Sequence, residues 1–416
     1  MTQLSTLLQT NIASNVWSTQ TTSFTAATRQ AYQLILSSAI TITLPATPAN
    51  GDHIRLIDYN QNSSTYNVTI VHNGNNIQGQ AADMVIDING ISLELTFVTG
   101  QGWIISDTGN IIPPSPGYGF KNRIINGATN IAQRGASIAV PTANTDIYGG
   151  PDRFRADNSG GGQFTQSQSS LTYNGITKLT VRQTVNTAAT TLTGISYWSG
   201  LRQIIEGFNS YDLVGQTVTV SFIFNTNVTG TYSLSLQDSG TNSYVTTFAA
   251  TANTPTKITK TISIPTNLSI PNSTAIGVWI EIGFLNTATY QTSTLNVWQS
   301  TWLGTANTQT NWGATIGNFI ELTELQLEVG SYATPFEQRP YGIELALCQR
   351  YYETGYSVFA TGVYAGFSYK VDKRIGPTIA FGSHAGTITG TTPTPYGFYA
   401  VCDTLTAFSY TVSAEL

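Results

Sequence analysis

The sequence predicts an all-β protein with a small N-terminal β domain, a central antiparallel β-sandwich of the jelly-roll type, one short helix and a small C-terminal β domain. Three observations predict this class. Apolar and hydroxyl residues alternate in many short runs, which is the period-two pattern of strands. The 416 residues are 40% hydrophobic and 11% aromatic, so the chain can bury a core. Helical periodicity is sustained in one segment only.

The composition also narrows the range of partners. Charged residues make up 9% of the chain, against roughly 25% in an ordinary soluble domain, and polarity comes instead from Thr, Ser, Asn, Gln and Gly. Such a surface suits contacts with neutral, polyhydroxyl partners. The formal net charge of −5, without any run of Lys or Arg, argues against nucleic acid as a partner.

Targeting signals and ligand sets are also absent from the sequence. No stretch approaches ~18 apolar residues, so we expect no membrane insertion. Met1–Val16 has neither the basic start nor the apolar centre of a secretory signal. Cys348 and Cys402 are too few for a disulfide framework or a zinc site, and we expect both to be small buried hydrophobic residues. We therefore predict no metal, no cofactor and synthesis in a reducing cytosol.

The N-terminal part is predicted to contain three regions. Residues 1–20 are polar and weakly patterned, and we expect an extended or partly helical attachment segment there. Residues 21–110 are predicted to form the small β domain. Its strand signals are Ala39–Leu44, His53–Asp58, Tyr66–Val71 and Ile91–Val98. Trp103–Ile105 follows a Gly-containing loop, which predicts a hairpin with the preceding strand. Residues 111–120 contain three prolines and are predicted to form a semi-rigid linker.

Residues 121–340 are predicted to form the jelly roll, because long alternating runs are joined by connections of ten or more residues. The runs are Lys178–Arg182, Thr217–Phe224, Tyr232–Leu236, Lys257–Ile264, Ile276–Phe284 and Phe319–Val329. In the last run the apolar residues change parity, since Ile320 and Leu322 belong to one face but Leu325 belongs to the other. A slip of one residue reverses the faces of a strand, so we expect a β-bulge near Thr323.

Residues 341–416 are predicted to form the helix and the C-terminal β domain. Within Tyr341–Tyr352, the residues Ile343, Leu347 and Tyr351 recur at helical spacing directly after Pro340. The remaining residues return to strand signals separated by Gly and Pro turns. This helix could pack between domains or around a symmetry axis.

We predict no catalytic residues and no enzymatic activity. The sequence contains no HExxH, nucleophile-elbow or P-loop pattern. The histidines are scattered, at His53, His72 and His384. Glycoside cleavage would need two carboxylates ~5–10 Å apart. The candidates on one predicted strand are Glu321, Glu324 and Glu328. A solvated strand face explains these three residues better than an acid pair does.

Two groups of aromatic residues are candidates for binding a glycan. Sugar rings place their C–H faces on aromatic rings, and amide side chains bind their hydroxyl groups. The first group is Trp298, Trp302, Asn311 and Trp312, together with Tyr197 and Trp198. Ordinary packing in the core or between subunits is the alternative for this group. The second group, at a distal tip, is Tyr396, Phe398 and Tyr399. The sequence does not decide between the two sites.

Six stretches of the chain form a distinctive set. They are Asn122–Gly127, Ile131–Gly135, Asp152–Phe154, Gln326–Glu337, Glu344–Tyr352 and Ser413–Leu416. In these stretches and their separations the chain resembles a bacteriophage tail-fibre or receptor-binding family with a carbohydrate-binding-like jelly-roll domain. Phe154 stands where the family more often has Trp, and Ala128-Thr129 replaces a more acidic or aromatic pair. Residues 42–45, 51–52, 73–74, 77–79 and 102–103 are similar to N-terminal fibre domains of short tail proteins.

The resemblance implies a subunit of an elongated homotrimer in the virion tail fibre, assembled in the host cytoplasm. It implies that the N-terminal segment attaches to a tail or baseplate protein and that the trimer binds a host-surface receptor, which we expect to be a glycan. A purely structural virion component, such as a collar, neck or baseplate fibre, is the alternative. At the base of the sandwich, we expect Arg134 and Arg153 to pair with carboxylates such as Glu324 or Glu328.

Overall fold

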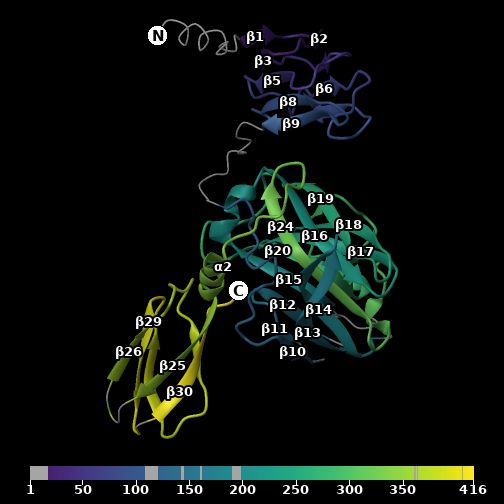
Figure 1. The fold of residues 1–416 in the computed structure, drawn as a ribbon. Helices are drawn as coiled ribbons and strands as arrows, with labels where there is room; N and C mark the ends of the chain where they lie inside the picture. The colour runs from purple at the N-terminus through teal and green to yellow at the C-terminus, as the bar shows by residue number, and fades with distance from the viewer. Residues whose placement is uncertain are drawn as a thin grey trace, which may run out of the picture. The chain divides into compact units, whose positions relative to one another are not determined.

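The fold was determined as a computed structural model, which describes residues 17–107, 120–141, 145–159, 162–189, 198–359, 362, 364–404 and 406–416 (Figure 1). The chain divides into a smaller unit, Met1–Pro114, and a larger unit, Ser115–Leu416. The described residues are mostly in strands, with one α-helix, so the predicted all-β class is confirmed. Residues 1–16 of the predicted attachment segment and all but the last residue of the predicted linker lie outside the described residues.

The smaller unit contains two sheets, with the orders β1-β3-β5-β8-β9 and β2-β4-β6-β7. The strands are β1 (Trp17–Gln20), β2 (Phe24–Thr25), β3 (Gln30–Leu34), β4 (Ile40–Thr43), β5 (His53–Asp58), β6 (Val68–Val71), β7 (Met84–Ile86), β8 (Ser92–Val98) and β9 (Gly102–Asp107). Each strand signal of this unit corresponds to an observed strand. β8 and β9 form the predicted hairpin.

From β1 to β6 the chain alternates between the two sheets and forms a short parallel coil. β1 pairs with β3 and β3 with β5 in one sheet, while β2 pairs with β4 and β4 with β6 in the other. Trp17 lies beside Ala31, and Ala31 lies beside Arg55, so successive turns of the coil differ in length. Because the turns are unequal, the sequence shows no repeat, and strand alternation alone could not predict parallel pairing.

The larger unit begins with the predicted jelly roll, whose main sheets have the orders β10-β13-β14-β24-β16-β19 and β11-β12-β15-β20-β17-β18-β22. The strands of the six-stranded sheet are β10 (Ser137–Val140), β13 (Gln163–Tyr173), β14 (Ile176–Thr187), β16 (Thr217–Thr226), β19 (Thr256–Ser263) and β24 (Phe319–Val329). Those of the seven-stranded sheet are β11 (Thr145–Tyr148), β12 (Phe154–Asn158), β15 (Trp198–Glu206), β17 (Gly230–Asp238), β18 (Ser243–Ala250), β20 (Ile276–Asn286) and β22 (Trp298–Gln299).

The two jelly-roll sheets share one hydrophobic core. All pairings within both sheets are antiparallel, and rings such as Phe222, Phe224 and Phe248 contact one another in the core. The shorter elements are η1 (Gly207–Asn209), η2 (Tyr211–Leu213), η3 (Ala288–Tyr290), η4 (Trp312–Ala314), β21 (Gln291–Thr292) and β23 (Thr305–Ala306). The antiparallel sandwich predicted for this part of the chain is therefore present.

The predicted β-bulge lies in β24. Ser221 of β16 pairs with Gln326, and Ile223 pairs with Thr323, so β24 contains one residue more than its partner over this interval. Glu324 has a positive φ of 53° within this bulge. The β-bulge predicted from the change of parity is confirmed. The extra residue in β24 turns Leu325 to the opposite parity from Ile320 and Leu322. Leu325, in the bulge, donates its backbone N–H to the carbonyl oxygen of Gly127 at 3.0 Å.

The helix α2 (Tyr341–Gln349) is present and ends three residues before the predicted end, because Tyr352 already belongs to a strand. Two three-stranded sheets follow, β25-β30-β27 and β26-β29-β28. Their strands are β25 (Tyr352–Phe359), β26 (Tyr364–Ser368), β27 (Thr378–Phe381), β28 (Ile388–Pro393), β29 (Gly397–Cys402) and β30 (Thr406–Ser413). Cys348 and Cys402 are free and buried, as predicted. Among the described residues, no helix is long and apolar enough to cross a membrane.

Buried ion pairs join the jelly roll to the last residues of the chain. The carboxylate of Glu415 pairs with Arg153 and, at 3.0 Å, with Arg134. The Arg153 guanidinium lies 3.6 Å from the ring centre of Tyr351, and that of Arg134 lies 3.5 Å from the ring centre of Tyr352. We call these five residues the Glu415 cluster. Its two arginines and its carboxylate are nearly excluded from solvent, so each charge depends on its partners.

The partners predicted for the two arginines were wrong. Glu324 instead pairs with Lys178 at 2.6 Å, and Glu328 accepts hydrogen bonds from Thr334. Both carboxylates are on β24, whereas Glu415 follows β30, near the C-terminal end of the larger unit. The chain therefore uses its few charges to close contacts between distant segments.

Candidate functional site

The first group of predicted aromatic residues lies on or beside a segment that covers the outer face of the seven-stranded sheet. This face is the side of the sheet opposite the core. Ser243 accepts a hydrogen bond from the backbone N–H of Leu303 at 3.1 Å, and Ser233 accepts one from that of Ala306 at 2.9 Å. Between them, a Cβ added at Gly304 would lie 2.7 Å from Oε2 of Glu281. Residues 301–306, which we call the strap, therefore run tightly across the polar face.

The tryptophans of this group hold the strap and its flanking turns in place. Trp298 donates its indole N–H to the carbonyl oxygen of Ser263 at 2.8 Å. The ring of Trp302 packs edge-on against Tyr290, with 4.4 Å between ring centres. Both indoles are half-buried. These contacts fit the packing alternative, although part of each ring stays exposed.

Trp312 leaves no ring face free for a sugar. It is fully buried and donates its indole N–H to the carbonyl oxygen of Gly283 at 2.6 Å. This burial removes Trp312 from the candidate glycan site. Asn311 donates from its side-chain amide to the carbonyl oxygen of Ala189 at 2.9 Å. Tyr197 lies outside the described residues, and Trp198 starts β15 with a side chain that is likewise not described.

A buried charge network lies on the same outer face. Arg202 pairs with both Asp157 and Glu281, and Arg155 contacts Asp157 at 2.7 Å. Burial raises the pKa of the Asp157 and Glu281 carboxyl groups, and Arg202 opposes that shift. Arg155 and Asp157 alternate along β12, but β20 carries Glu281 alone, so only the register of the sheet could match these charges. Because Arg202 pairs with both carboxylates and Arg155 also pairs with Asp157, this network does not resemble a free acid pair.

The remaining candidate carboxylate and the histidines do not form a catalytic group either. Glu321 is buried and accepts two hydrogen bonds of 3.0 Å from Arg182. His72 lies 2.6 Å from Asp83, His53 is in β5 and His384 lies 2.6 Å from the carbonyl oxygen of Gly382. Within the described residues no group of three His, Cys, Asp or Glu could hold a metal ion.

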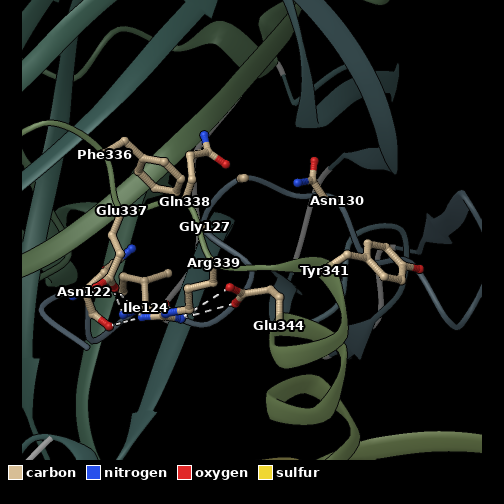
Figure 2. Close-up of a pocket in the computed structure, with 11 residues that line it drawn as sticks. Asn122, Ile124, Gly127, Asn130, Phe336, Glu337, Gln338, Arg339, Tyr341 and Glu344 are labelled. Carbon is tan, nitrogen blue, oxygen red and sulfur yellow. Dashed lines mark hydrogen bonds and ion pairs between the residues drawn. The ribbon is translucent and has the colours of Figure 1, made fainter. Parts of the chain in front are cut away.

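A small hollow lies where the jelly roll meets α2 (Figure 2). Its volume is about 60 Å³, which is room for a few water molecules. Arg339 lies in it, donates to the carbonyl oxygens of Asn122 and Ile124, and pairs with Glu337 and Glu344. The hollow is therefore a hydrogen-bonded joint between segments and is too small for a sugar ring.

The second group of predicted aromatic residues presents exposed rings on the C-terminal sandwich. Tyr399, in the central strand β29, is 60% exposed, and Tyr396, in the turn before β29, is 69% exposed. Phe398 is only 2% exposed and packs in the core of this sandwich. The prediction that Phe398 belongs to a distal binding surface is therefore wrong, because its ring is buried. Alternation along β29 explains the difference, because neighbouring residues face opposite sides.

Tyr399 lies between two small or hydroxylated residues. It pairs with Gly366 on β26 and with Thr392 on β28. A Cβ added at Gly366 would lie 3.3 Å from Cε1 and 3.5 Å from Cδ1 of Tyr399, so the ring leans over the glycine. The exposed ring and its hydroxylated neighbour can offer a sugar both a stacking surface and hydrogen bonds.

Comparisons with protein-family models and with curated proteins find no match. Among solved structures, a CBM4 structure is 13% identical, with a TM-score of 0.26 over 50% of this chain and 99% of its own. The enzymatically active domain of tailspike protein 4 of bacteriophage CBA120 is 10% identical, with a TM-score of 0.28 over 76% of this chain and 38% of its own. The C-terminal family 22 carbohydrate binding module of Clostridium thermocellum Xyn10B is 15% identical, with a TM-score of 0.26 over 46% of this chain and all of its own. Likenesses at these scores carry no argument about function.

Proposed function

We propose that this chain is a bacteriophage tail-fibre subunit that binds a host-surface glycan through its C-terminal sandwich. The observation that carries the proposal is the pair of exposed tyrosines, Tyr396 and Tyr399, of which Tyr399 lies on a sheet whose three strands contain no charged residue. Neither ring belongs to the hydrophobic core of this small domain, and Tyr is enriched at binding surfaces.

The stretches that resemble the tail-fibre family support the proposal, because they contact one another although they are far apart in sequence. Asn126, in the first stretch, donates its backbone N–H to Glu344 in the helix stretch. Arg153 pairs with Glu415, in the last stretch. Asp152 accepts a hydrogen bond from Gln133 at 2.6 Å. The resemblance therefore concerns one set of interlocking residues.

The proposal includes a homotrimer whose N-terminal segment attaches to a tail or baseplate protein of the virion. Linking weak sites raises effective affinity by ~10²–10⁴ when the copies can engage together. We propose a binding protein rather than an enzyme, because the carboxylates considered for glycoside cleavage are held by Arg182, Lys178 and Thr334. A structural fibre without receptor binding would share this fold but would not bind cells in the staining test below.

The trimer is tested by the mass of the full-length protein in solution. We expect light scattering coupled to size exclusion to give the mass of three chains of 44.7 kDa at micromolar concentration. A monomer at that concentration would count against the trimer and against avidity as its advantage.

The binding surface is tested by replacing both exposed tyrosines. Labelled wild-type protein is expected to stain a subset of strains in a panel of bacteria, measured by flow cytometry. The double variant Tyr396→Ala, Tyr399→Ala should lower staining by about tenfold or more, since loss of one aromatic anchor costs about 1–2 kcal/mol or more. Tyr59→Ala is the matched control, because Tyr59 is 62% exposed in the smaller unit. Wild-type protein that stains no strain would instead favour the structural fibre.

A further inference from the structure

We infer that Tyr399, positioned by Gly366, forms a stacking site for the C–H face of a neutral sugar unit. This inference rests on the proposed function and adds a ligand class and a positioning residue. Three observations carry it: the space at Gly366, the exposure of the tyrosine ring and the lack of charge on the sheet around it.

Gly366 provides space rather than backbone freedom. Its φ lies outside the left-handed region, where glycine is otherwise required. The Cβ atom of any side chain at this position would already lie 3.3–3.5 Å from ring carbons of Tyr399, and further side-chain atoms would crowd the ring more. Glycine in a strand often marks a close approach by another group, and here that group is the tyrosine ring. The glycine thus allows the ring to lie low over β26.

The sheet around Tyr399 carries no charge. The sequences of β26, β28 and β29 contain no Asp, Glu, Lys, Arg or His. The charged residues Lys370 and Asp403 follow β26 and β29 and lie beyond the ends of these strands. Lys370 donates to the carbonyl oxygen of Thr354 at 2.8 Å, and Asp403 accepts from the backbone of Thr387 at 2.9 Å. An anionic sugar over Tyr399 would lose hydration without meeting a cationic side chain on these three strands. A neutral sugar has no charge to desolvate, so it avoids this cost.

The ring could instead serve only to shield the backbone of a strand glycine, which is a known stabilising device of β-sheets. The two roles make different predictions. Shielding alone predicts that changes at Tyr399 or Gly366 alter stability and leave binding unchanged. A stacking site predicts loss of binding even in variants that remain folded.

The test uses the strain that wild-type protein stains most strongly. Its surface polysaccharide is separated by anion exchange into a neutral and an anionic fraction, and each fraction is immobilised. We expect full-length protein to bind the neutral fraction with the same affinity at about 0.01 M and about 1 M salt, although the Debye length falls from ~30 to ~3 Å. Binding to the anionic fraction alone, or weakening by tenfold or more in high salt, would overturn the inference.

Four variants separate stacking from shielding. Gly366→Val, which forces the ring away, and Tyr399→Leu, which keeps apolar volume without a flat ring, should each lose about tenfold or more in affinity. Tyr399→Phe should retain most of the affinity, because it keeps the ring. Tyr356→Ala, on the other sheet of the same sandwich and 71% exposed, should bind like wild type. Thermal unfolding checks that each variant is folded. If Gly366→Val does not fold, the affinity of Tyr399→Leu alone decides between stacking and shielding.

The failure of this inference differs from the failure of the proposed function. If wild type stains cells but Tyr399→Leu binds as well as wild type, the stacking site is wrong and an adhesive fibre remains. If wild type stains no strain, the adhesive function itself has failed.

Discussion

Replacement of Glu415 by alanine is expected to destabilise the larger unit by about 3–5 kcal/mol. Removal of one partner of a buried ion pair leaves the other charge without compensation. In this chain two arginines would be affected at once, since Glu415 pairs with Arg134 and Arg153, and the Arg153 side chain is only 1% exposed. The cation–π contacts with Tyr351 and Tyr352 would remain but cannot replace a carboxylate.

The measurement is chemical denaturation of the full-length protein at fixed concentration, because assembly would otherwise shift the apparent stability. Glu415→Gln keeps an acceptor and is expected to lose less. Asp146→Ala is the matched control. Its carboxylate also pairs with an arginine, at 3.6 Å, but is 57% exposed, so we expect a change within about 1 kcal/mol. Equal effects of Glu415→Ala and Asp146→Ala would show that the Glu415 cluster does not hold the larger unit together.

Replacement of Gly127 by alanine is expected to destabilise the larger unit by about 3 kcal/mol. A Cβ at this position would collide with the carbonyl oxygen of Leu325 and lie 3.2 Å from its carbonyl carbon. Both atoms belong to the backbone of the bulge in β24, so no side-chain rotation can relieve the clash. Relief would require β24 to move and would break the hydrogen bond from Leu325 to Gly127.

Gly342→Ala provides the comparison for this second prediction. Gly342 lies in the first turn of α2, and an added Cβ meets nothing within 4 Å. Alanine is preferred to glycine in helices by ~1 kcal/mol, so this variant should be as stable as wild type or slightly more stable. Denaturation midpoints of both variants decide the matter. A Gly127→Ala protein with the wild-type midpoint would mean that the bulge tolerates displacement.

Local features of the fold could be predicted from the sequence because they depend on neighbouring residues. The alternating runs marked the observed strands, and the change of parity at Leu325 marked the bulge. Ile343 and Leu347 placed the helix correctly, whereas Tyr351, the third residue of the pattern, lies beyond its end at Gln349. Its end was set instead by tertiary structure, since Tyr352 pairs with Ser413 in a sheet.

Contacts between distant segments could not be predicted in the same way. The parallel coil joins turns of unequal length, so no repeat reveals its register. Arg153 and Glu415 are separated by most of the larger unit, and the charge of each was compatible with several partners. The sequence could name charged residues but could not match them.

The candidate site was predicted in part. Tyr396 and Tyr399 were identified from their residue types, but alternation alone would have separated Tyr399 from Phe398, because adjacent strand residues face opposite sides. The importance of Gly366 had no sequence signal, since it depends on pairing with Tyr399 across two strands. Burial of Trp312 was equally hidden, because a tryptophan among amides suits either a binding face or a core.

The unequal parallel turns of the smaller unit have a consequence for how this unit can vary in length. Within the parallel coil from β1 to β6, each turn pairs with the turns directly before and after it. In such stacked architectures an insertion or deletion of a whole turn leaves the remaining pairings unchanged. The number of turns in this unit can therefore change without altering the register of the turns that remain.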